Sequence, residues 1–192
     1  AFRPEVINIG LTESMLAEMR RTDLTRQDEE PVIALMVARF DYRKGVDVLV
    51  RAMREVVNAG AQVRAIVAGK GIERPNLETL IKDLELEEHV QLVGPVDLEG
   101  LRCLYGRASM FVLPTRYEGF GIVLIEAMAA GLPIVSTTVG AVPDVVGDAG
   151  RLVPPEDPHA FAEAMLSLYG DSETAVSLGV AGMARVNERY RW

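Results

Sequence analysis

Two glutamates, Glu118 and Glu126, stand eight residues apart on either side of a glycine turn. The run before them, residues 109–114, is apolar and ends in proline, as expected of a buried parallel strand. Residues 122–131 are almost wholly apolar and carry one charge, Glu126, which predicts a helix buried nearly all round. Because burying an unpartnered carboxylate costs several kcal/mol, Glu126 is expected either to pair with a cation or to face a polar ligand.

Two cations could complete a site for an anion. Arg39 and Lys44 follow another apolar run, residues 31–38. Gly119 and Gly121 lie just before the apolar helix, whose N-terminus would offer backbone N–H groups to an anion. A guanidinium and an ammonium can together neutralise the charge of a departing nucleoside diphosphate. If the two segments meet, they predict a diphosphate site.

The same residues allow other interpretations. Beside a diphosphate, Glu118 and Glu126 could accept hydrogen bonds from the hydroxyls of a sugar or ribose. A glycoside hydrolase or phosphorylase could instead use the two glutamates as an acid/base pair, although it would have no use for the cations. A non-catalytic module could bind a sugar nucleotide and do nothing further. The cations could also be surface residues that are solvated or paired with Asp41 and Asp47.

The amino-acid composition limits the kinds of protein and partner that fit this sequence. The 192 residues are 49% hydrophobic and 25% charged, which suits one well-cored globular domain. Acidic residues number 28 against 20 basic ones, a formal charge of −8, which argues against a nucleic-acid partner. The only cysteine, Cys103, cannot form an internal disulfide and is expected to pack in the core. No apolar run approaches the ~20 residues of a membrane span, and no signal-peptide pattern is present, so a cytoplasmic location is expected.

No metal site is predicted. The sequence contains no Cys/His cluster with zinc spacing and no D-x-D motif that could hold a divalent ion beside a diphosphate. Arg39 and Lys44 would then neutralise charge that a magnesium ion neutralises elsewhere. His89 and His159 are far in sequence from the candidate site and are expected on the surface.

The elements that must position these residues alternate between strand and helix, which predicts an α/β domain with a mainly parallel, doubly wound, Rossmann-like sheet. Strands are expected over residues 31–38, 63–68, 90–93, 110–113, 133–136 and 151–153, and helices over residues 46–58, 77–84, 98–105, 122–131, from 158 and over 173–191. Residues 31–192 form this domain, and residues 1–30 are a linker or its start. In the strand order 3-2-1-4-5-6, the loops after strands one and four share the ligand site.

Three segments resemble a known family. V-A-R-F with K-G, at residues 37–45, resembles the G-R-L-x-x-x-K-G segment of nucleotide-sugar glycosyltransferases related to glycogen synthase and the phosphatidylinositol mannosyltransferases (glycosyltransferase family 4, group 1). Residues 118–129 resemble their E-x7-E element, and residues 131–144 resemble their G-x-P-V-V-x-x-x-x-G-G-x-P-E stretch. The ordered set covers residues 32–192.

The resemblance implies the C-terminal, donor-binding half of a retaining transferase with two Rossmann-like domains (GT-B). It implies catalytic roles for Arg39 and Lys44 on the diphosphate and for Glu118 on the donor sugar, with Glu126 receiving the ribose hydroxyls. The other residues implied to line the donor are Gly71, Val93, Gly94, Pro95, Phe120, Gly121, Ile122 and Val123. The nucleoside diphosphate sugar is a substrate, and no cofactor is implied.

The resemblance also implies an N-terminal domain that carries most of the acceptor site. We expect this domain to be absent from the chain, so that the chain alone is inactive, and any membrane association to come through it. The donor base, the sugar and the acceptor are not implied.

Overall fold

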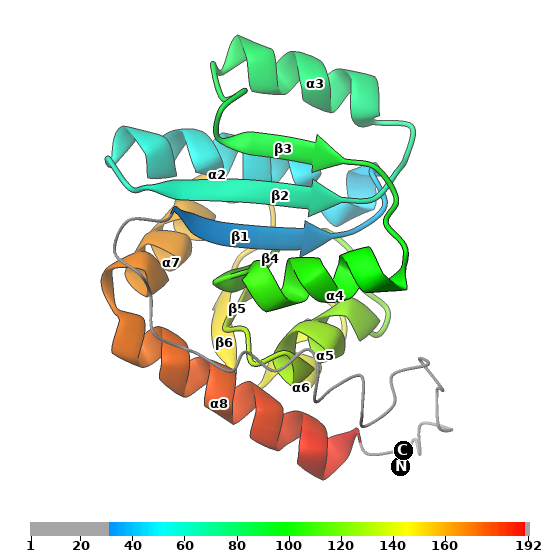
Figure 1. The fold of residues 1–192 in the computed structure, drawn as a ribbon, viewed down its shortest axis with the longest axis vertical. Helices are drawn as coiled ribbons and strands as arrows, with labels where there is room; N and C mark the ends of the chain where they lie inside the picture. The colour runs from blue at the N-terminus through cyan, green and yellow to red at the C-terminus, as the bar shows by residue number, and fades with distance from the viewer. Residues whose placement is uncertain (1–30, 191–192) are drawn as a thin grey trace.

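The computed structural model describes residues 31–190 and shows one six-stranded sheet with helices on both faces (Figure 1). The strands are β1 (Val32–Val37), β2 (Val63–Ala68), β3 (Val90–Val93), β4 (Met110–Leu113), β5 (Ile134–Thr137) and β6 (Gly150–Val153). All neighbours pair in parallel, in the order β3-β2-β1-β4-β5-β6. The predicted doubly wound α/β class and strand order are confirmed. The predicted linker, residues 1–30, lies outside the described residues.

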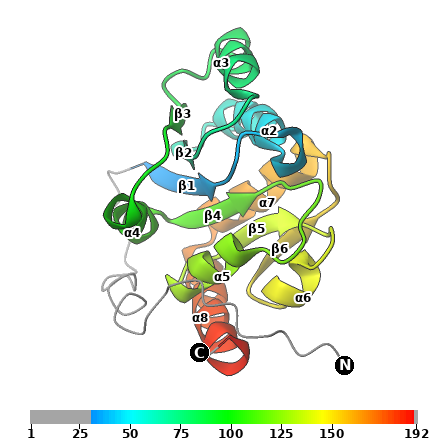
Figure 2. The same cartoon turned by 90° about the vertical axis from the view of Figure 1, so that its right-hand side faces the viewer.

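The helices follow the predicted alternation. They are η1 (Tyr42–Lys44), α2 (Val46–Asn58), α3 (Arg74–Asp83), α4 (Leu98–Arg107), α5 (Ile122–Ala129), α6 (Val142–Val146), α7 (Pro158–Gly170) and α8 (Ser172–Arg189). In Figures 1 and 2, α2 and α7 lie on one side of the sheet and α4 and α5 on the other. The single turn η1 and the short α6 were not predicted, because neither is long enough to show a helical repeat of apolar residues.

The strands are apolar because most of them are covered on both faces. Leu35, Phe111 and Val112, in the central strands β1 and β4, are fully buried. Helix α5 is buried over most of its surface because it lies between the sheet and α8, where Gly179 and Gly182 allow α8 to approach closely. The expectation of a nearly all-buried helix is therefore confirmed from Leu124 onward for the apolar residues of α5, whereas Ile122 and Val123 in its first turn are only partly buried.

The expectation that Cys103 packs in the core was wrong, because the residue is exposed. Helix α4 buries Tyr105, and Ala108, directly after the helix, is buried as well. Cys103 precedes Tyr105 by two positions, which is about 200° around a helix and therefore on the solvent side.

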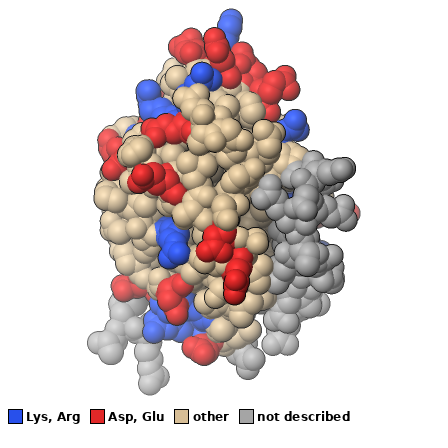
Figure 3. All heavy atoms as spheres, turned by 90° about the vertical axis from the view of Figure 1, so that its left-hand side faces the viewer, with Lys and Arg blue, Asp and Glu red and all other residues tan. Residues whose placement is uncertain are grey.

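Strands β1 and β4 are neighbours, with Ala34 opposite Met110 and Leu35 opposite Phe111. Figure 2 looks onto the carboxyl ends of the strands, where the loops after β1 and β4 emerge together. Figure 3 shows the opposite edge, on which acidic and basic side chains are interspersed among uncharged ones. No helix within residues 31–190 has the length and apolar composition needed to cross a membrane.

Gly45 marks the closest approach of the two loops. It ends η1 and begins α2 in a left-handed conformation, with φ at 68°. A Cβ atom on Gly45 would lie 2.0 Å from the carbonyl oxygen of Pro114, directly after β4. The residue is glycine both because φ is positive and because another backbone occupies the space of a side chain.

We predict that Gly45→Ala destabilises the chain more than Gly60→Ala. Gly60 has a similar φ of 77°, but nothing lies within 4 Å of its Cβ position, so alanine there costs only the left-handed strain of about 1–2 kcal/mol. At Gly45 the backbone must also shift, which adds about 1–3 kcal/mol. Urea unfolding measures the free energy of unfolding of both variants. An equal decrease in the two would show that the close contact with Pro114 does not add to the cost at Gly45.

Candidate functional site

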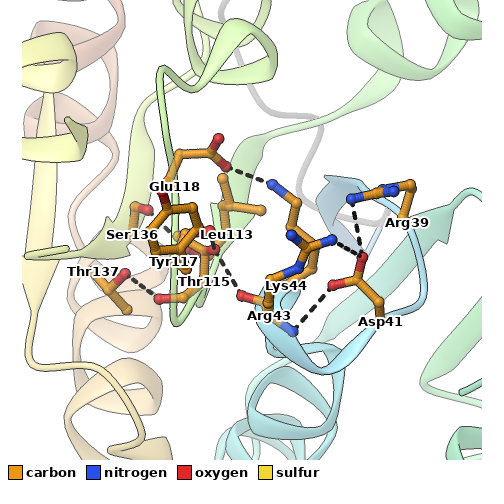
Figure 4. A network of polar contacts seen from close by, with 10 residues as sticks. All are labelled: Arg39, Asp41, Arg43, Lys44, Leu113, Thr115, Tyr117, Glu118, Ser136 and Thr137. Atoms are coloured by element: carbon orange, nitrogen blue, oxygen red, sulfur yellow. Dashed lines mark hydrogen bonds and ion pairs between the residues drawn. The ribbon is translucent and has the colours of Figure 1, made fainter. Parts of the chain in front are cut away.

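An ion pair joins the loops after β1 and β4. Lys44, the last residue of η1, places its Nζ 2.7 Å from Oε2 of Glu118, in the β4–α5 loop (Figure 4). The two side chains are only 19% and 11% exposed. The alternative that the sequence left open for Lys44, pairing with Asp41 or Asp47, is therefore not observed. Instead, two of the predicted site residues, Lys44 and Glu118, are in direct contact.

Backbone contacts fix the same two loops. The carbonyl oxygen of Arg43 accepts hydrogen bonds from the backbone N–H of Arg116 at 2.7 Å and from Oγ1 of Thr115 at 2.9 Å. Thr137, at the end of β5, donates from Oγ1 to the Thr115 carbonyl at 2.6 Å. Figure 4 shows the contacts from Thr137 to Thr115 and from Thr115 to Arg43. Lys44 is thus positioned by its neighbour's backbone as well as by its own charge.

Arg39 lies apart from the ion pair. Its Nη2 is 3.2 Å from Oδ2 of Asp41, and Arg43 contacts the same oxygen at 3.3 Å. The Arg39 side chain is 67% exposed. The pairing with Asp41 that the sequence left open is therefore present, but an exposed pair contributes only about 0–1 kcal/mol. Arg39 can exchange this partner for a stronger anion at little cost.

Arg116 is a residue that the sequence analysis did not single out. Its guanidinium binds both carboxylate oxygens of Asp47 at 2.8 Å and donates to the Tyr42 carbonyl at 2.7 Å. It also donates to Glu156 at 3.0 Å and lies over the Tyr42 ring, 4.0 Å from its centroid. Burial opposes ionisation of Asp47, but the bonds to Arg116 outweigh it and lower the pKa of Asp47 below its ordinary value. Arg116 thereby ties together the loops after β1, β4 and β6.

The glycine loop leads into the N-terminus of α5. Gly121 begins the helix with a φ of 79° and no side-chain cap. The first N–H groups of a helix have no acceptor within it, so those of Ile122 and Val123 are available to an anion. Phe120 packs edge-on against Tyr190, with ring centroids 6.4 Å apart. This contact anchors the loop to the end of α8.

Glu126 has a neutral partner rather than a cation. Tyr105, fully buried on α4, donates its hydroxyl to Oε2 of Glu126 at 2.9 Å. The Tyr105 ring packs against Phe111 of β4 at a centroid distance of 6.0 Å. Burial raises the pKa of Glu126, and the Tyr105 hydrogen bond only partly offsets it. Within residues 31–190 this is the only hydrogen bond to the Glu126 carboxylate.

The remaining predicted residues lie beyond β1, at the ends of β2 and β3. A Cβ on Gly71 would lie 2.1 Å from the carbonyl oxygen of Phe40, so close loop packing by itself explains this glycine. Val93 ends β3 and, like Gly94, is partly buried, whereas Pro95 is exposed. These residues therefore border the carboxyl edge of the sheet on the β3 side of the Lys44–Glu118 pair.

A groove of about 340 Å³ lies elsewhere, between α2 and α3. It is lined by Asp41, Asp47, Glu73 and Asp83, with Arg51 as its basic residue. This excess of carboxylates would repel a diphosphate, so the groove does not suit the anion site that the sequence predicts. No group of three or more His, Cys, Asp or Glu side chains that could hold a metal ion occurs within residues 31–190.

Comparisons with known proteins all point to the same protein family. Residues 21–185 match the family described as glycosyl transferases group 1. An uncharacterized glycosyltransferase of Methanocaldococcus jannaschii is 35% identical over 194 residues, covering 98% of this chain and 48% of the relative. A GDP-mannose-dependent monoacylated alpha-(1-6)-phosphatidylinositol monomannoside mannosyltransferase of Corynebacterium glutamicum is 31% identical over 180 residues, covering 90% of this chain and 46% of the relative.

A comparison with solved structures also finds a similar protein. The sucrose-phosphate synthase of Thermosynechococcus elongatus superposes with a TM-score of 0.79 and 36% sequence identity, covering 92% of this chain and 45% of that one. The chain therefore spans about half the length of the relatives it matches.

We predict that Glu126→Gln raises the melting temperature at pH 7. A carboxyl whose pKa is raised by folding contributes its stability fully below its unfolded pKa, near 4.5, and loses it as the pH rises through the folded value. Glutamine is neutral at every pH, so the variant should exceed the wild type at pH 7 and match it below about pH 4. Each kcal/mol corresponds to about 2–4 °C in a chain of this size.

Calorimetry at several pH values measures this difference. Glu188→Gln, on the exposed side of α8, is the control and should leave the melting temperature nearly unchanged. If the difference in melting temperature between Glu126→Gln and the wild type is the same at every pH, burial does not oppose ionisation of the Glu126 carboxyl.

Proposed function

Because the chain belongs to the group 1 glycosyl transferases, we propose that it is the donor-binding half of a retaining enzyme that transfers a sugar from a nucleoside diphosphate sugar to an acceptor. The observation that carries this proposal is the Lys44–Glu118 contact at the switch point of the sheet. Ligands of open α/β sheets bind at this point, outside the carboxyl ends of the strands. The two residues there bring both a cation for phosphate and an acceptor for sugar hydroxyls.

Lys44 can serve phosphate without releasing Glu118. An ammonium group has three donors, and Glu118 accepts from one of them. The others can meet a phosphate oxygen, while the ion pair keeps the carboxylate of Glu118 in place. The second oxygen of Glu118 is then oriented to accept from a hydroxyl of the donor sugar.

The departing diphosphate gathers negative charge as its bond to the sugar breaks. Lys44, Arg39 and the uncapped N-terminus of α5 are the groups that would stabilise this charge. Their positive charge makes a metal ion unnecessary, so we propose metal-independent transfer. Groups already in position stabilise a transition state most effectively, and the backbone contacts of Arg43 hold the Lys44 loop before the donor arrives.

The names of relatives support the donor class. The mannosyltransferase of C. glutamicum is named as GDP-mannose-dependent. From this we infer a nucleoside diphosphate sugar as the donor, with its base and sugar open, and an acceptor site on a second Rossmann-like domain of the same protein. We also propose a cytoplasmic location, with any membrane association through that second domain. Nothing in the comparisons supports the glycoside hydrolase alternative.

A thermal-shift screen against UDP-, GDP- and ADP-sugars tests the proposed function. A ligand at one hundred times its Kd stabilises a protein by about 2.7 kcal/mol, which corresponds to a rise of several degrees here. The three bases also separate the possible donors. If no nucleotide sugar at millimolar concentration shifts the melting temperature, the donor-binding proposal is wrong.

We predict that Arg39→Ala and Lys44→Ala each weaken binding of the nucleoside diphosphate about tenfold or more, with little effect on the nucleoside. Charge-assisted hydrogen bonds contribute about 1.5–3 kcal/mol each. Lys44→Ala should cost more, because it also leaves Glu118 unpaired beside the phosphate. Isothermal titration calorimetry measures both ligands. Arg64→Ala, exposed on β2, is the control for lost charge, and equal losses for nucleoside and diphosphate would contradict the assignment.

We predict further that this chain binds a nucleotide sugar but does not transfer the sugar. Holding donor and acceptor together contributes about 7–11 kcal/mol to lowering a barrier, and a second domain closing over the donor would also exclude water. Release of free nucleoside diphosphate is measured with the donor found by thermal shift, for this chain and for a two-domain protein. Acceptor-dependent release by the 192-residue chain at the two-domain rate would show that the acceptor site lies within it.

A further inference from the structure

We propose that Tyr105 is a positioning residue for the donor: its hydroxyl holds one oxygen of Glu126 so that the other accepts from a ribose hydroxyl of the nucleotide. This inference rests on the proposed function, because it names the residue that orients Glu126 for the proposed contact with the ribose. Tyr105 itself does not touch the ligand. The residue lies on α4, 21 positions before Glu126, and it is not part of the segments by which the chain resembles its family.

The geometry allows little freedom at this contact. Tyr105 is fully buried, and its ring packs against Phe111 in the central strand β4. Its hydroxyl therefore occupies a fixed position, 2.9 Å from Oε2 of Glu126. Glu126 extends from α5, five residues after the Gly121 cap, which places its backbone about 7 Å along the helix from the proposed phosphate site. A ribose joined to the diphosphate spans a distance of this order.

The chemistry of the pair favours a ligand over a purely structural role. Glu126 is the only polar side chain of α5, and Tyr105 is the only fully buried tyrosine within residues 31–190. Replacing both partners of a buried hydrogen bond by apolar groups of similar shape is often nearly neutral for stability. Burial already opposes the charge of Glu126, so stability alone gives no reason to keep a carboxylate there.

The partner of Glu126, the Tyr105 hydroxyl, is neutral, so Glu126 keeps the negative charge that makes it a good acceptor for a ribose hydroxyl. Lys44 neutralises Glu118, whereas the Tyr105 hydroxyl orients Glu126 and leaves its negative charge in place. A hydrogen bond to a charged acceptor is about twice as strong as one between neutral groups. Glu126 is also only partly buried, so part of the residue faces the surface. The pair is therefore suited to hold a hydroxyl donor from outside.

The test compares ribose with deoxyribose in the wild type and in Tyr105→Phe. The probes are UDP, GDP and ADP and their 2′-deoxy and 3′-deoxy counterparts, measured by titration calorimetry with the base that binds most tightly. In the wild type, at least one deoxy form should bind about tenfold more weakly. In Tyr105→Phe the ribonucleotide should lose most of this advantage, so that the ratio falls to about threefold or less.

Tyr169→Phe is the matched control. It removes a tyrosine hydroxyl that accepts from the Gln62 N–H, on α7 and away from the proposed site, and it should leave the ratio unchanged. A merely structural role for Tyr105 would lower the melting temperature or weaken all nucleotides equally, with the wild-type ratio retained. That result would overturn the proposal.

Glu126→Gln tests the same contact from its other side, and it remains informative if Tyr105→Phe does not fold. It should reduce the ribose-to-deoxyribose ratio as Tyr105→Phe does, and the double variant should add little to either single change. An unchanged ratio in Glu126→Gln would overturn the inference. The proposed function fails separately, if the wild type binds none of the three nucleoside diphosphates.

Discussion

Strands β1 and β4 lie side by side in the sheet. Lys44 and Glu118, in the loops that follow these strands, are therefore brought into contact although they are 74 positions apart in sequence. Parallel pairing sends both chains out of the sheet at the same edge, so the following loops must share a small space. The contact of Gly45 with Pro114 shows how close the backbones come. The Lys44–Glu118 ion pair and the hydrogen bonds to the Arg43 carbonyl follow from this adjacency, because each of the two loops packs against the other.

Polar contacts then hold the loops together. The Arg43 carbonyl binds the loop after β4, Lys44 pairs with Glu118, and Arg116 extends the network to the loop after β6. Tyr105 performs a similar role from the other face of the sheet, on Glu126. These contacts fix the side chains of the candidate site, and groups held in place lose less conformational freedom when a ligand binds.

Much of this arrangement could be predicted from sequence, and for identifiable reasons. The apolar runs of β1 and β4 and the glycines between elements are local signals, so the strand order was predicted correctly. Arg116 and Tyr105 were not recognised because their partners lie 69 and 21 residues away, and nothing in the local sequence distinguishes them from a surface arginine and a core tyrosine. Which cation would pair with which carboxylate depends on loop geometry, and Lys44 pairs with neither of the aspartates near it in sequence. The assigned roles of Arg39, Glu118 and Glu126 in donor binding are still predictions.

The 74-residue separation between Lys44 and Glu118 also determines when the site can form during synthesis. At about 5–20 residues per second, a ribosome needs roughly 4 to 15 seconds to add that length of chain. Throughout this interval the nascent β1–α2 unit has an exposed apolar strand edge where β4 will later pair, and its lysine has no carboxylate partner. Nucleotide cannot assist this early stage, since the residues proposed to bind its sugars have not yet been made. The edge of β1 therefore gains its partner strand, and the candidate site its second loop, only after β4 has been made.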